Sequence, residues 1–263
     1  MNLELLTRQV CNTCRAVGGY IHDELSNINK LDIKEKGVHD YVTYVDKNSE
    51  KRLITDLAKL LPEAGFIVEE GSVVKKAIEY NWVIDPLDGT TNFIHHIPIY
   101  SISVALMRKN EVIIGVVYGV NNRECFYAWE NSQAFLNRAP IRVSETLKLD
   151  DSLLATGFPY NDYSMLDKYL ILFKNLMLKA RGIRRLGSAA IDLAYVACGR
   201  FDGFYEYGLH SWDVAAGAFI VQQAGGAVTS FNGGDDFIFG GEIIASNQGI
   251  NDDLTNIISN SFA

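Results

Sequence analysis

Two aspartates that flank a short proline-containing segment, Asp85 and Asp88, are the strongest chemical feature of the sequence. Pro86 fixes its own φ angle and favours an extended conformation at the residue before it. We therefore expect a tight turn that directs both carboxylates and the Leu87 carbonyl oxygen to one point. Hard divalent cations prefer oxygen ligands of this kind. The alternative is an ordinary turn in which an aspartate caps a helix.

Gly89 and Thr90, which follow directly, are suited to binding a phosphate group. A glycine permits close approach of the backbone to a ligand. If Thr90 begins a helix, the free amide groups of the first turn can receive a phosphate oxygen. The sequence thus predicts a metal site and a phosphate site next to each other.

Further acidic residues follow two apolar segments. Residues 66–68 precede Glu69 and Glu70, and residues 82–84 precede Asp85, so that two predicted strands each end in acid. This coincidence indicates that the strand ends contribute to one acidic site. Paired acids in a loop are usually solvated charge, which is the alternative for Glu69 and Glu70.

The hydrophobic pattern predicts the elements that position these acids. Apolar residues spaced three and four apart indicate helices, and short apolar runs bounded by polar turns indicate strands. The predicted helices span residues 3–26, 48–61, 165–179, 189–198, 214–224 and 251–259. The predicted strands span residues 66–68, 82–84, 101–107, 112–118, 124–128, 203–207, 227–230 and 243–246. Asp213 directly precedes a predicted helix, which it could merely cap.

The order of these elements predicts two layered subdomains that fold together. Short polar turns separate the strands between residues 101 and 128, which is typical of an antiparallel meander. Helices and strands alternate in the second half of the chain. Because no flexible linker is apparent, we place the seam near residue 148, between an N-terminal α+β subdomain, 1–148, and a C-terminal α/β subdomain, 149–263.

Composition limits the classes of function. The 263 residues are 48% hydrophobic, which excludes a disordered chain, and the net charge of −8 repels nucleic-acid phosphates and anionic lipids. A small anionic substrate would therefore need a metal ion. The apolar segment 97–107 is shorter than the roughly 20 residues that a membrane-spanning helix requires, and the N-terminus does not resemble a signal peptide. We expect a cytoplasmic protein that binds neither membranes nor nucleic acid directly.

The spacing of the cysteine and histidine residues does not predict a metal site. Cys11 and Cys14 lie at helical spacing, so we expect buried helix residues, with a zinc pair as the weaker alternative. Cys125 and Cys198 are predicted core residues. None of the histidines has metal-ligand spacing, and none is given a catalytic role: His22, His39, His95, His96 and His210.

Two longer motifs resemble the signatures of the inositol monophosphatase family, which consists of metal-dependent, lithium-sensitive phosphomonoesterases. The first is WVIDPLDGTTNF at residues 82–93, and the second is WDVAAG at residues 212–217 with AGG at 224–226. The resemblance spans nearly the whole chain. It implies an α/β fold, in the form of an α+β layered sandwich with alternating layers of helices and sheets, similar to fructose-1,6-bisphosphatase.

The resemblance also implies a set of site residues. Two or three Mg²⁺ ions would bind to Glu69, Asp85, the Leu87 carbonyl, Asp88 and Asp213. Glu69 and Thr90 would orient and activate a water molecule, with Asp46 hydrogen-bonded to the threonine hydroxyl. The residues implied at the substrate are Asp88, Gly89, Thr90, Arg184, Gly187, Ser188, Ala189, Glu206 and Asp213. Glu206 would accept hydrogen bonds from sugar or inositol hydroxyls, whereas Arg184 could instead pair with a surface acid.

One departure from the family pattern concerns the first metal loop. Family members commonly carry Gly-Glu-Glu-Ser, whereas this chain has Val68-Glu69-Glu70-Gly71. Both acids are retained, so metal binding is still expected. Gly71 in place of serine could loosen the loop and weaken binding of a third ion.

The expected function is Mg²⁺-dependent hydrolysis of a small phosphomonoester, with myo-inositol 1-phosphate as the leading substrate and a homodimer as the expected assembly. The alternative substrates are 3′-phosphoadenosine 5′-phosphate, fructose 1,6-bisphosphate, histidinol phosphate and NADP. A regulatory binding protein that retains the fold, with partners in the transcription or RNA machinery, is the alternative of another class.

Overall fold

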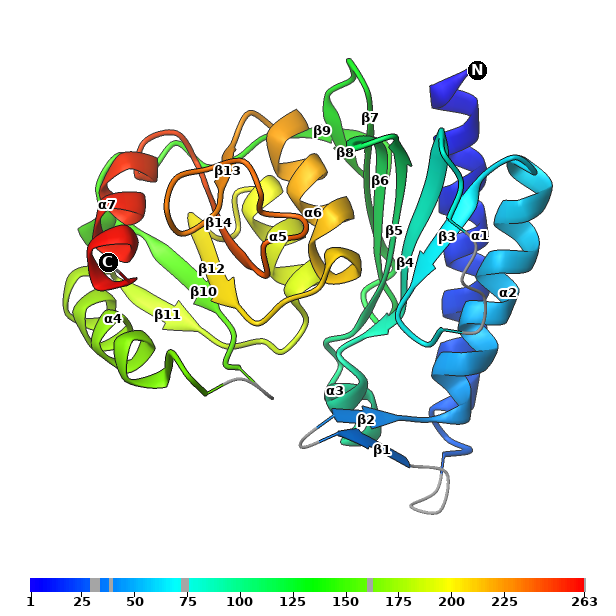
Figure 1. Cartoon of the computed structure of the whole chain (residues 1–263), viewed down its shortest axis with the longest axis horizontal. Coiled ribbons are helices and arrows are strands. Elements are labelled where there is room, and N and C mark those ends of the chain that lie inside the picture. Colours follow the sequence, from blue (N-terminus) through cyan, green and yellow to red (C-terminus); the bar gives the residue numbers. More distant parts are fainter. Residues whose placement is uncertain (29–33, 38–39, 72–75, 160–162, 263) are drawn as a thin grey trace.

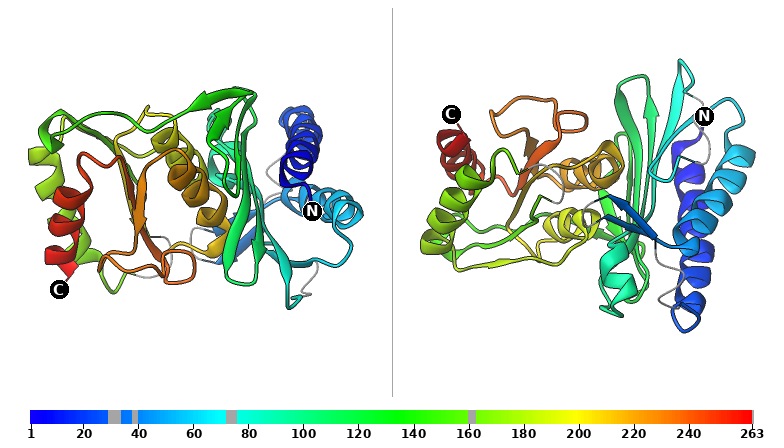
Figure 2. Two further views of the ribbon diagram at one scale, coloured as in Figure 1. Left: turned by 90° about the horizontal axis from the view of Figure 1, so that it is seen from above. Right: turned by 60° about the horizontal axis from the view of Figure 1, so that its bottom comes forward.

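The computed structural model describes residues 1–28, 34–37, 40–71, 76–159 and 163–262. Helices and sheets alternate in layers across the molecule (Figures 1 and 2). This arrangement confirms the predicted layered α+β fold. None of the helices within the described ranges combines the length and the apolar content that crossing a bilayer requires.

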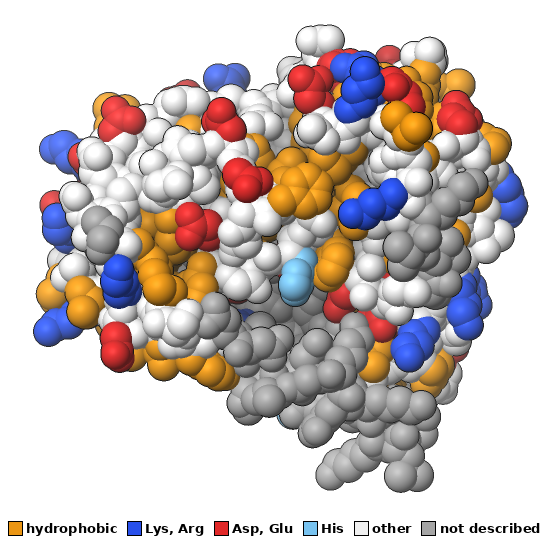
Figure 3. Space-filling model, viewed as in Figure 1, with side chains coloured by type: hydrophobic (Ala, Val, Ile, Leu, Met, Phe, Trp, Pro, Cys, Tyr) orange, Lys and Arg blue, Asp and Glu red, His pale blue; other side chains and the backbone are white. Residues whose placement is uncertain are grey.

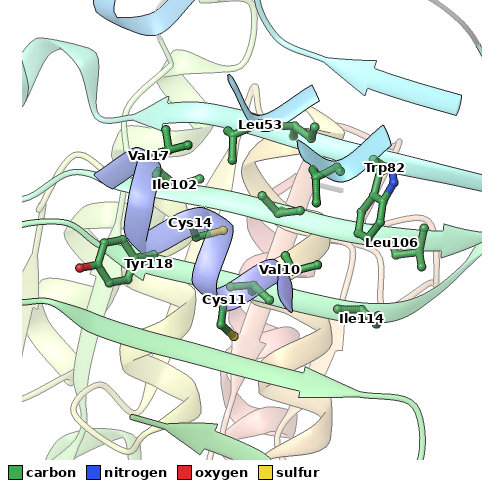
Figure 4. Close-up of a cluster of buried hydrophobic side chains, with 14 of the residues drawn as sticks. Val10, Cys11, Cys14, Val17, Leu53, Trp82, Ile102, Leu106, Ile114 and Tyr118 are labelled. Carbon is green, nitrogen blue, oxygen red and sulfur yellow. The ribbon is translucent and has the colours of Figure 1, made fainter. Parts of the chain in front are cut away.

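The first layer consists of α1 (Leu3–Glu24) and α2 (Tyr44–Leu60), which cover one face of the larger sheet (Figure 1). Figure 4 shows the apolar side of α1, with Val10 and Val17 facing the sheet residues Ile102 and Leu106. Cys11 and Cys14 belong to the same buried cluster and carry free thiols, which confirms that they are buried helix residues. The apolar stripe thus fixes both helices against the sheet.

The larger sheet has seven strands in the order β3-β4-β5-β6-β7-β8-β9. Its strands are β3 (Gly65–Val68), β4 (Tyr80–Asp88), β5 (Ser101–Arg108), β6 (Glu111–Gly119), β7 (Glu124–Trp129), β8 (Ala134–Leu136) and β9 (Ala139–Ile141). The neighbours from β4 to β9 pair in antiparallel fashion, which confirms the predicted meander, and β3 is parallel to β4. The ends of β3 and β4 therefore lie at the same edge of the sheet.

The central layer consists of α5 (Ala189–Ala197) and α6 (Ser211–Gln223), which lie between the two sheets. Both helices are buried on almost every side, as expected of helices that are apolar all round. The smaller sheet has five strands, namely β10 (Leu153–Thr156), β11 (Gly182–Arg184), β12 (Gly203–Tyr207), β13 (Ala227–Thr229) and β14 (Glu242–Ser246). Helices α4 (Leu166–Lys179) and α7 (Asn251–Phe262) form the outermost layer.

Several features differ from the elements predicted from the sequence. Helix α6 begins at Ser211 instead of residue 214, so that Asp213 lies within its first turn. Helix α2 begins at Tyr44 instead of residue 48, because Thr43 and Asp46 form a capping box at its start. Strand β4 does not stop at Asp85 but continues through Asp88. Several of the short elements were not predicted, because so few residues carry little periodicity: β1 (Lys34–Gly37), β2 (Asp40–Val42), α3 (Thr90–Ile94), β8, β9, β10, β11 and a 3₁₀ turn, η2 (Leu149–Asp151).

The larger sheet lies before residue 148 and the smaller sheet after it. The buried cluster that contains α5 and α6 also includes Val83 and Ala105 from the larger sheet. The central helices therefore join the two parts of the chain through one apolar core. The division into two subdomains at residue 148 stays a prediction.

Candidate active site

The acidic site is built at the shared edge of β3 and β4. Glu69 follows β3 directly, and its backbone N–H donates a hydrogen bond to the Ile84 carbonyl of β4 at 3.3 Å. Pairing between β4 and β5 is irregular between Asp85 and Asp88, where Pro86 has no N–H to donate. This irregularity turns the end of the strand, and the Leu87 N–H donates to Asp85 Oδ1 at 2.9 Å.

Three carboxylates meet at this edge. Asp85, Asp88 and Asp213 each place one carboxylate oxygen within 4.8 Å of the others. This spacing would allow the three side chains to hold one metal ion. Glu69 lies outside that tight group but lines the same cavity, which has a volume of about 410 Å³. The alternative readings of these acids, as turn residues or solvated charge, do not account for their convergence.

Burial makes this cluster unfavourable without a cation. Asp85 is only 2% exposed, and burial together with the charges of Glu69, Asp88 and Asp213 raises its pKa well above the ordinary value. Burial likewise raises the pKa of Asp213, and it raises that of Asp88 to about 6. A hard divalent ion would relieve this repulsion, and the donors are the oxygen ligands that Mg²⁺ prefers. The residues present therefore fit a magnesium site.

Thr90 links the acidic cluster to α2. Its Oγ1 lies 2.9 Å from Asp46 Oδ1 and 3.0 Å from the Leu87 carbonyl oxygen, so one hydroxyl proton serves two acceptors. Asp46 is fully buried, and its other oxygen accepts hydrogen bonds from the Thr43 N–H and hydroxyl. Asp46 does not line the cavity itself. It fixes the position of the threonine that does.

Asp88 is held by the start of α5. Asp88 Oδ2 accepts hydrogen bonds from the Ser188 hydroxyl at 2.6 Å and from the Ala190 N–H at 2.8 Å. Asn92 donates to the Ile99 and Leu186 carbonyl oxygens, which ties α3 to the segment before α5. The two ends of the cavity are thus joined by hydrogen bonds between residues far apart in the sequence.

Asp213 combines capping with a place in the site. It lies in the first turn of α6, and Asp213 Oδ2 accepts a hydrogen bond from the His210 N–H at 2.7 Å. The His210 ring stacks on Trp212 with centroids 4.7 Å apart, and all three residues line the cavity. Capping and site lining are therefore not alternatives for Asp213.

Glu206 forms the opposite wall, on β12. It is 7% exposed, and burial raises its pKa to about 8, while the positive charge of Arg185 acts in the other direction. Gly157 makes room for it, because a Cβ atom at that position would overlap the Glu206 carboxylate. A side chain at residue 157 would therefore have to displace the Glu206 carboxylate.

The structure brings most of the predicted site residues to one cavity. Those that line it are Glu69, Asp85, Leu87, Asp88, Gly89, Thr90, Gly187, Ser188, Ala189, Glu206 and Asp213. It does not bring Arg184 there. Arg184 ends β11, is exposed, and donates to the Ile183 carbonyl oxygen, whereas the neighbouring Arg185 lines the cavity.

Several cavity residues were not predicted from the sequence, among them Gly157, Asp192 and His210. One signal for Asp192 was present, since it is the single charged residue in the apolar helix AAIDLAYVA. The left-handed φ of 66° at Gly71 explains why glycine suits the position where the family pattern has serine.

The chain is similar to known proteins over almost its whole length. The model of the inositol monophosphatase family matches residues 2–261. A putative Nus factor SuhB from Neisseria meningitidis serogroup A is 43% identical over 246 residues, which cover 93% of this chain and 94% of that protein. An inositol-1-monophosphatase from Mesorhizobium japonicum is 38% identical over 232 residues, 88% of this chain and 87% of that protein.

A solved structure shows the same fold. The extragenic suppressor protein suhB from Bartonella henselae superposes with a TM-score of 0.89 at 39% identity, over 94% of this chain and 95% of the other. The resemblance inferred from the two sequence motifs is thereby confirmed over almost the full length. This chain belongs to the inositol monophosphatase family.

Proposed function

We propose that the protein is a Mg²⁺-dependent phosphatase that hydrolyses a small polyol phosphate, with myo-inositol 1-phosphate as the leading substrate. The observation that carries the proposal is the convergence of Asp85, Asp88 and Asp213 within 4.8 Å in one cavity. Glu69 and the Leu87 carbonyl complete the proposed ligand set for two or three ions. Family membership supports a phosphatase, and the cavity supports the choice of metal.

Mg²⁺ bound at these residues supplies positive charge that stabilises the phosphoryl group in the transition state and makes a water molecule more acidic. The chain itself orients the attacking water. Thr90 Oγ1 donates to the buried Asp46 carboxylate, so its lone pairs face away from that carboxylate and can accept a hydrogen bond from water. Glu69 borders the same space and is the proposed base.

The phosphate and the alcohol occupy different parts of the cavity in this proposal. The phosphate lies against the amide groups of Gly89 and Thr90, where α3 begins and the amides have no helical acceptors. The alcohol faces Ser188, Ala189 and Glu206, whose carboxylate accepts hydrogen bonds from hydroxyl groups. This division favours a substrate that is charged at one end and rich in hydroxyls at the other.

The test is phosphate release from a panel of substrates, each with Mg²⁺ and with EDTA. The panel contains inositol 1-phosphate, fructose 1,6-bisphosphate, histidinol phosphate, NADP and 3′-phosphoadenosine 5′-phosphate. Release led by inositol 1-phosphate and abolished by EDTA supports the proposal. Release led by another member replaces the substrate and keeps the mechanism, whereas metal-independent release contradicts the mechanism.

Lithium inhibition is a further part of the proposal, which rests on family membership and on the same carboxylates. We expect turnover of inositol 1-phosphate to fall when Li⁺ replaces Na⁺ at equal ionic strength, with K⁺ as the control cation. Unchanged turnover at Li⁺ concentrations on the order of tens of millimolar would count against it, while leaving the Mg²⁺ requirement in place.

A homodimer is the proposed assembly, and exposed apolar residues on α4 support it. Leu170, Ile171, Met177 and Leu178 are each more than half exposed, and apolar side chains are visible over α4 at the lower left of Figure 3. Sedimentation equilibrium of an Ile171→Lys, Leu178→Lys variant should show a monomer. Leu5→Lys, at an equally exposed position on α1, is the control and should leave the dimer intact.

A second candidate function is a regulatory binding role, which the relatives named Nus factor SuhB favour. We propose partners in the transcription or RNA machinery, bound through protein surfaces. Basic side chains are scattered over the described part of the face in Figure 3, which does not favour direct contact with nucleic acid. Capture of transcription proteins by both the native chain and Asp88→Asn would support this role. Failure of both proteins to capture them would exclude it.

A cytoplasmic location stays a prediction.

A further inference from the structure

Asp192 is a buried carboxylate in the wall of the cavity that the metal site does not use. It lies in the first turn of α5, is only 1% exposed, and lines the cavity. Its Oδ1 atom is fully buried and has no hydrogen-bond partner among the residues that the structure describes. The three carboxylates that converge within 4.8 Å do not include it.

A second buried aspartate shows what a purely structural carboxylate looks like in this protein. Asp202 is 8% exposed and accepts hydrogen bonds from the Ser144 hydroxyl at 2.5 Å and from the Leu153 N–H at 2.6 Å. Its oxygens therefore hold two segments of the chain together. A buried carboxylate without such partners destabilises the fold, so a partner from outside the chain is the simplest reason to retain it.

The surroundings of Asp192 identify which part of a ligand would reach it. Glu206 and Asp88 are the negative charges that act on Asp192, and Arg185 is the positive charge. Arg185 also acts on Glu206, so both acids lie near the same guanidinium group. Asp192 therefore lies close to Glu206 and Asp88, where α5 packs against β12. The alcohol part of the substrate lies in this part of the cavity in the proposed function.

We propose that Asp192 is a specificity-determining residue that accepts a hydrogen bond from a hydroxyl group of the substrate alcohol, directly or through one water molecule. With Glu206 it forms a pair of acceptors that selects phosphomonoesters whose alcohol carries at least two free hydroxyls. An alcohol without hydroxyls would leave both acceptors buried and unpaired, which is the arrangement that gives a site strong discrimination. This inference rests on the proposed phosphatase function and narrows its substrate class.

The experiment compares two substrates with the same ring, inositol 1-phosphate and cyclohexyl phosphate, which lacks the hydroxyls. Asp192→Leu removes both acceptor oxygens at similar size, and Asp192→Asn replaces one of them with an N–H donor. We expect Asp192→Leu to lower the ratio of kcat/KM for inositol 1-phosphate over cyclohexyl phosphate by about tenfold or more, with Asp192→Asn intermediate. Hydrolysis of cyclohexyl phosphate should be no slower than in the native protein, because the metal ligands are unchanged and one acceptor that this substrate leaves unpaired is removed.

Stability provides a second readout, with Asp202→Asn as the matched control. Without substrate, Asp192→Leu should melt no lower than the native protein, because a buried oxygen without a hydrogen-bond partner is removed. Asp202→Asn should melt lower and leave the substrate ratio unchanged, because its hydrogen bonds are structural.

The outcomes separate this inference from the proposed function. If the native protein hydrolyses neither substrate with Mg²⁺, the proposed function fails and this inference fails with it. If it hydrolyses both but the Asp192 variants change the two rates equally or not at all, the inference alone is overturned. A lower melting temperature of both Asp192 variants with an unchanged ratio would likewise show a structural residue and overturn it.

Discussion

Thr90 and Asp46 are 44 positions apart in the sequence, yet Thr90 Oγ1 lies 2.9 Å from Asp46 Oδ1. The contact joins the start of α3 to the first turn of α2 across the edge of the larger sheet. Asp46 is held in turn by Thr43 through the capping box. A local helix-capping interaction therefore fixes the orientation of a hydroxyl group in the candidate active site.

This relationship predicts unequal effects of two substitutions at Thr90. Thr90→Val keeps the shape but removes the hydroxyl, so turnover of inositol 1-phosphate with Mg²⁺ should fall by about a hundredfold. Thr90→Ser retains the hydroxyl and should keep most of the activity. Steady-state kinetics on both variants, with circular dichroism as the control for folding, checks this. Native turnover in Thr90→Val would show that the hydroxyl does not orient the water.

Gly157 provides a test of the Glu206 wall. A Cβ atom at residue 157 would overlap the Glu206 carboxylate, so Gly157→Ala should displace that side chain. We expect kcat/KM for inositol 1-phosphate to fall by about tenfold or more, with Mg²⁺ dependence unchanged. Gly19→Ala is the control, because a Cβ atom there meets no neighbour within 4 Å. Equal kinetics of both variants would argue against a role for Glu206.

The two adjacent glycines of α1 predict opposite changes in stability. Gly19 is exposed, so Gly19→Ala should raise the free energy of unfolding by about 0.5–1 kcal/mol through helix propensity. Gly18 is buried, and a Cβ atom there would overlap the Tyr118 ring, so Gly18→Ala should lower it by about 1–3 kcal/mol. Urea unfolding of the two variants measures both changes. A gain in stability from Gly18→Ala would contradict the packing of α1 on β6.

The raised pKa values predict how the metal-free protein responds to pH. Burial raises the pKa of Asp88 from 3.8 to about 6 and that of Glu206 from 4.5 to about 8. The folded state therefore binds these protons more tightly than the unfolded state, and the stability they contribute is lost as pH rises through the folded-state values. In EDTA, the melting temperature should fall between about pH 5 and about pH 8.

Two controls make this prediction specific. Glu206→Gln should reduce the fall in melting temperature, because one of the titrating groups is removed. Added Mg²⁺ should raise the melting temperature most at the higher pH, since the metal binds the ionised carboxylates. A melting temperature in EDTA that rises over this range, or the same slope in Glu206→Gln, would contradict the assignment.

The sequence predicted those parts of the site that depend on local spacing. The Asp85–Asp88 pair was recognisable because a proline and a glycine define the chain path around it. Asp213 was ambiguous from the sequence, since capping and ligation use the same residue type. The structure shows it in both places, next to the His210 N–H and within the acidic cluster.

The missed residues depend mainly on tertiary relationships, although the single charge in the apolar helix α5 was a local signal for Asp192. Arg184 and Arg185 are adjacent and β11 ends between them, so the sequence could not show which of the two reaches the cavity. Asp192 is buried in the cavity because α5 lies between two sheets, which is a consequence of the tertiary arrangement. The same holds for Gly157, whose importance depends on Glu206, 49 positions later in the chain.

The most direct test of the account is a Mg²⁺ titration of the native protein and of Asp213→Asn by calorimetry, with phosphate release from inositol 1-phosphate measured in the same samples. The substitution removes one ligand charge from the cluster while retaining an acceptor for the His210 N–H. We expect weaker Mg²⁺ binding and at least about a hundredfold lower activity, with an unchanged fold by circular dichroism. Native Mg²⁺ binding and native turnover in Asp213→Asn would show that the acidic cluster is not the catalytic metal site.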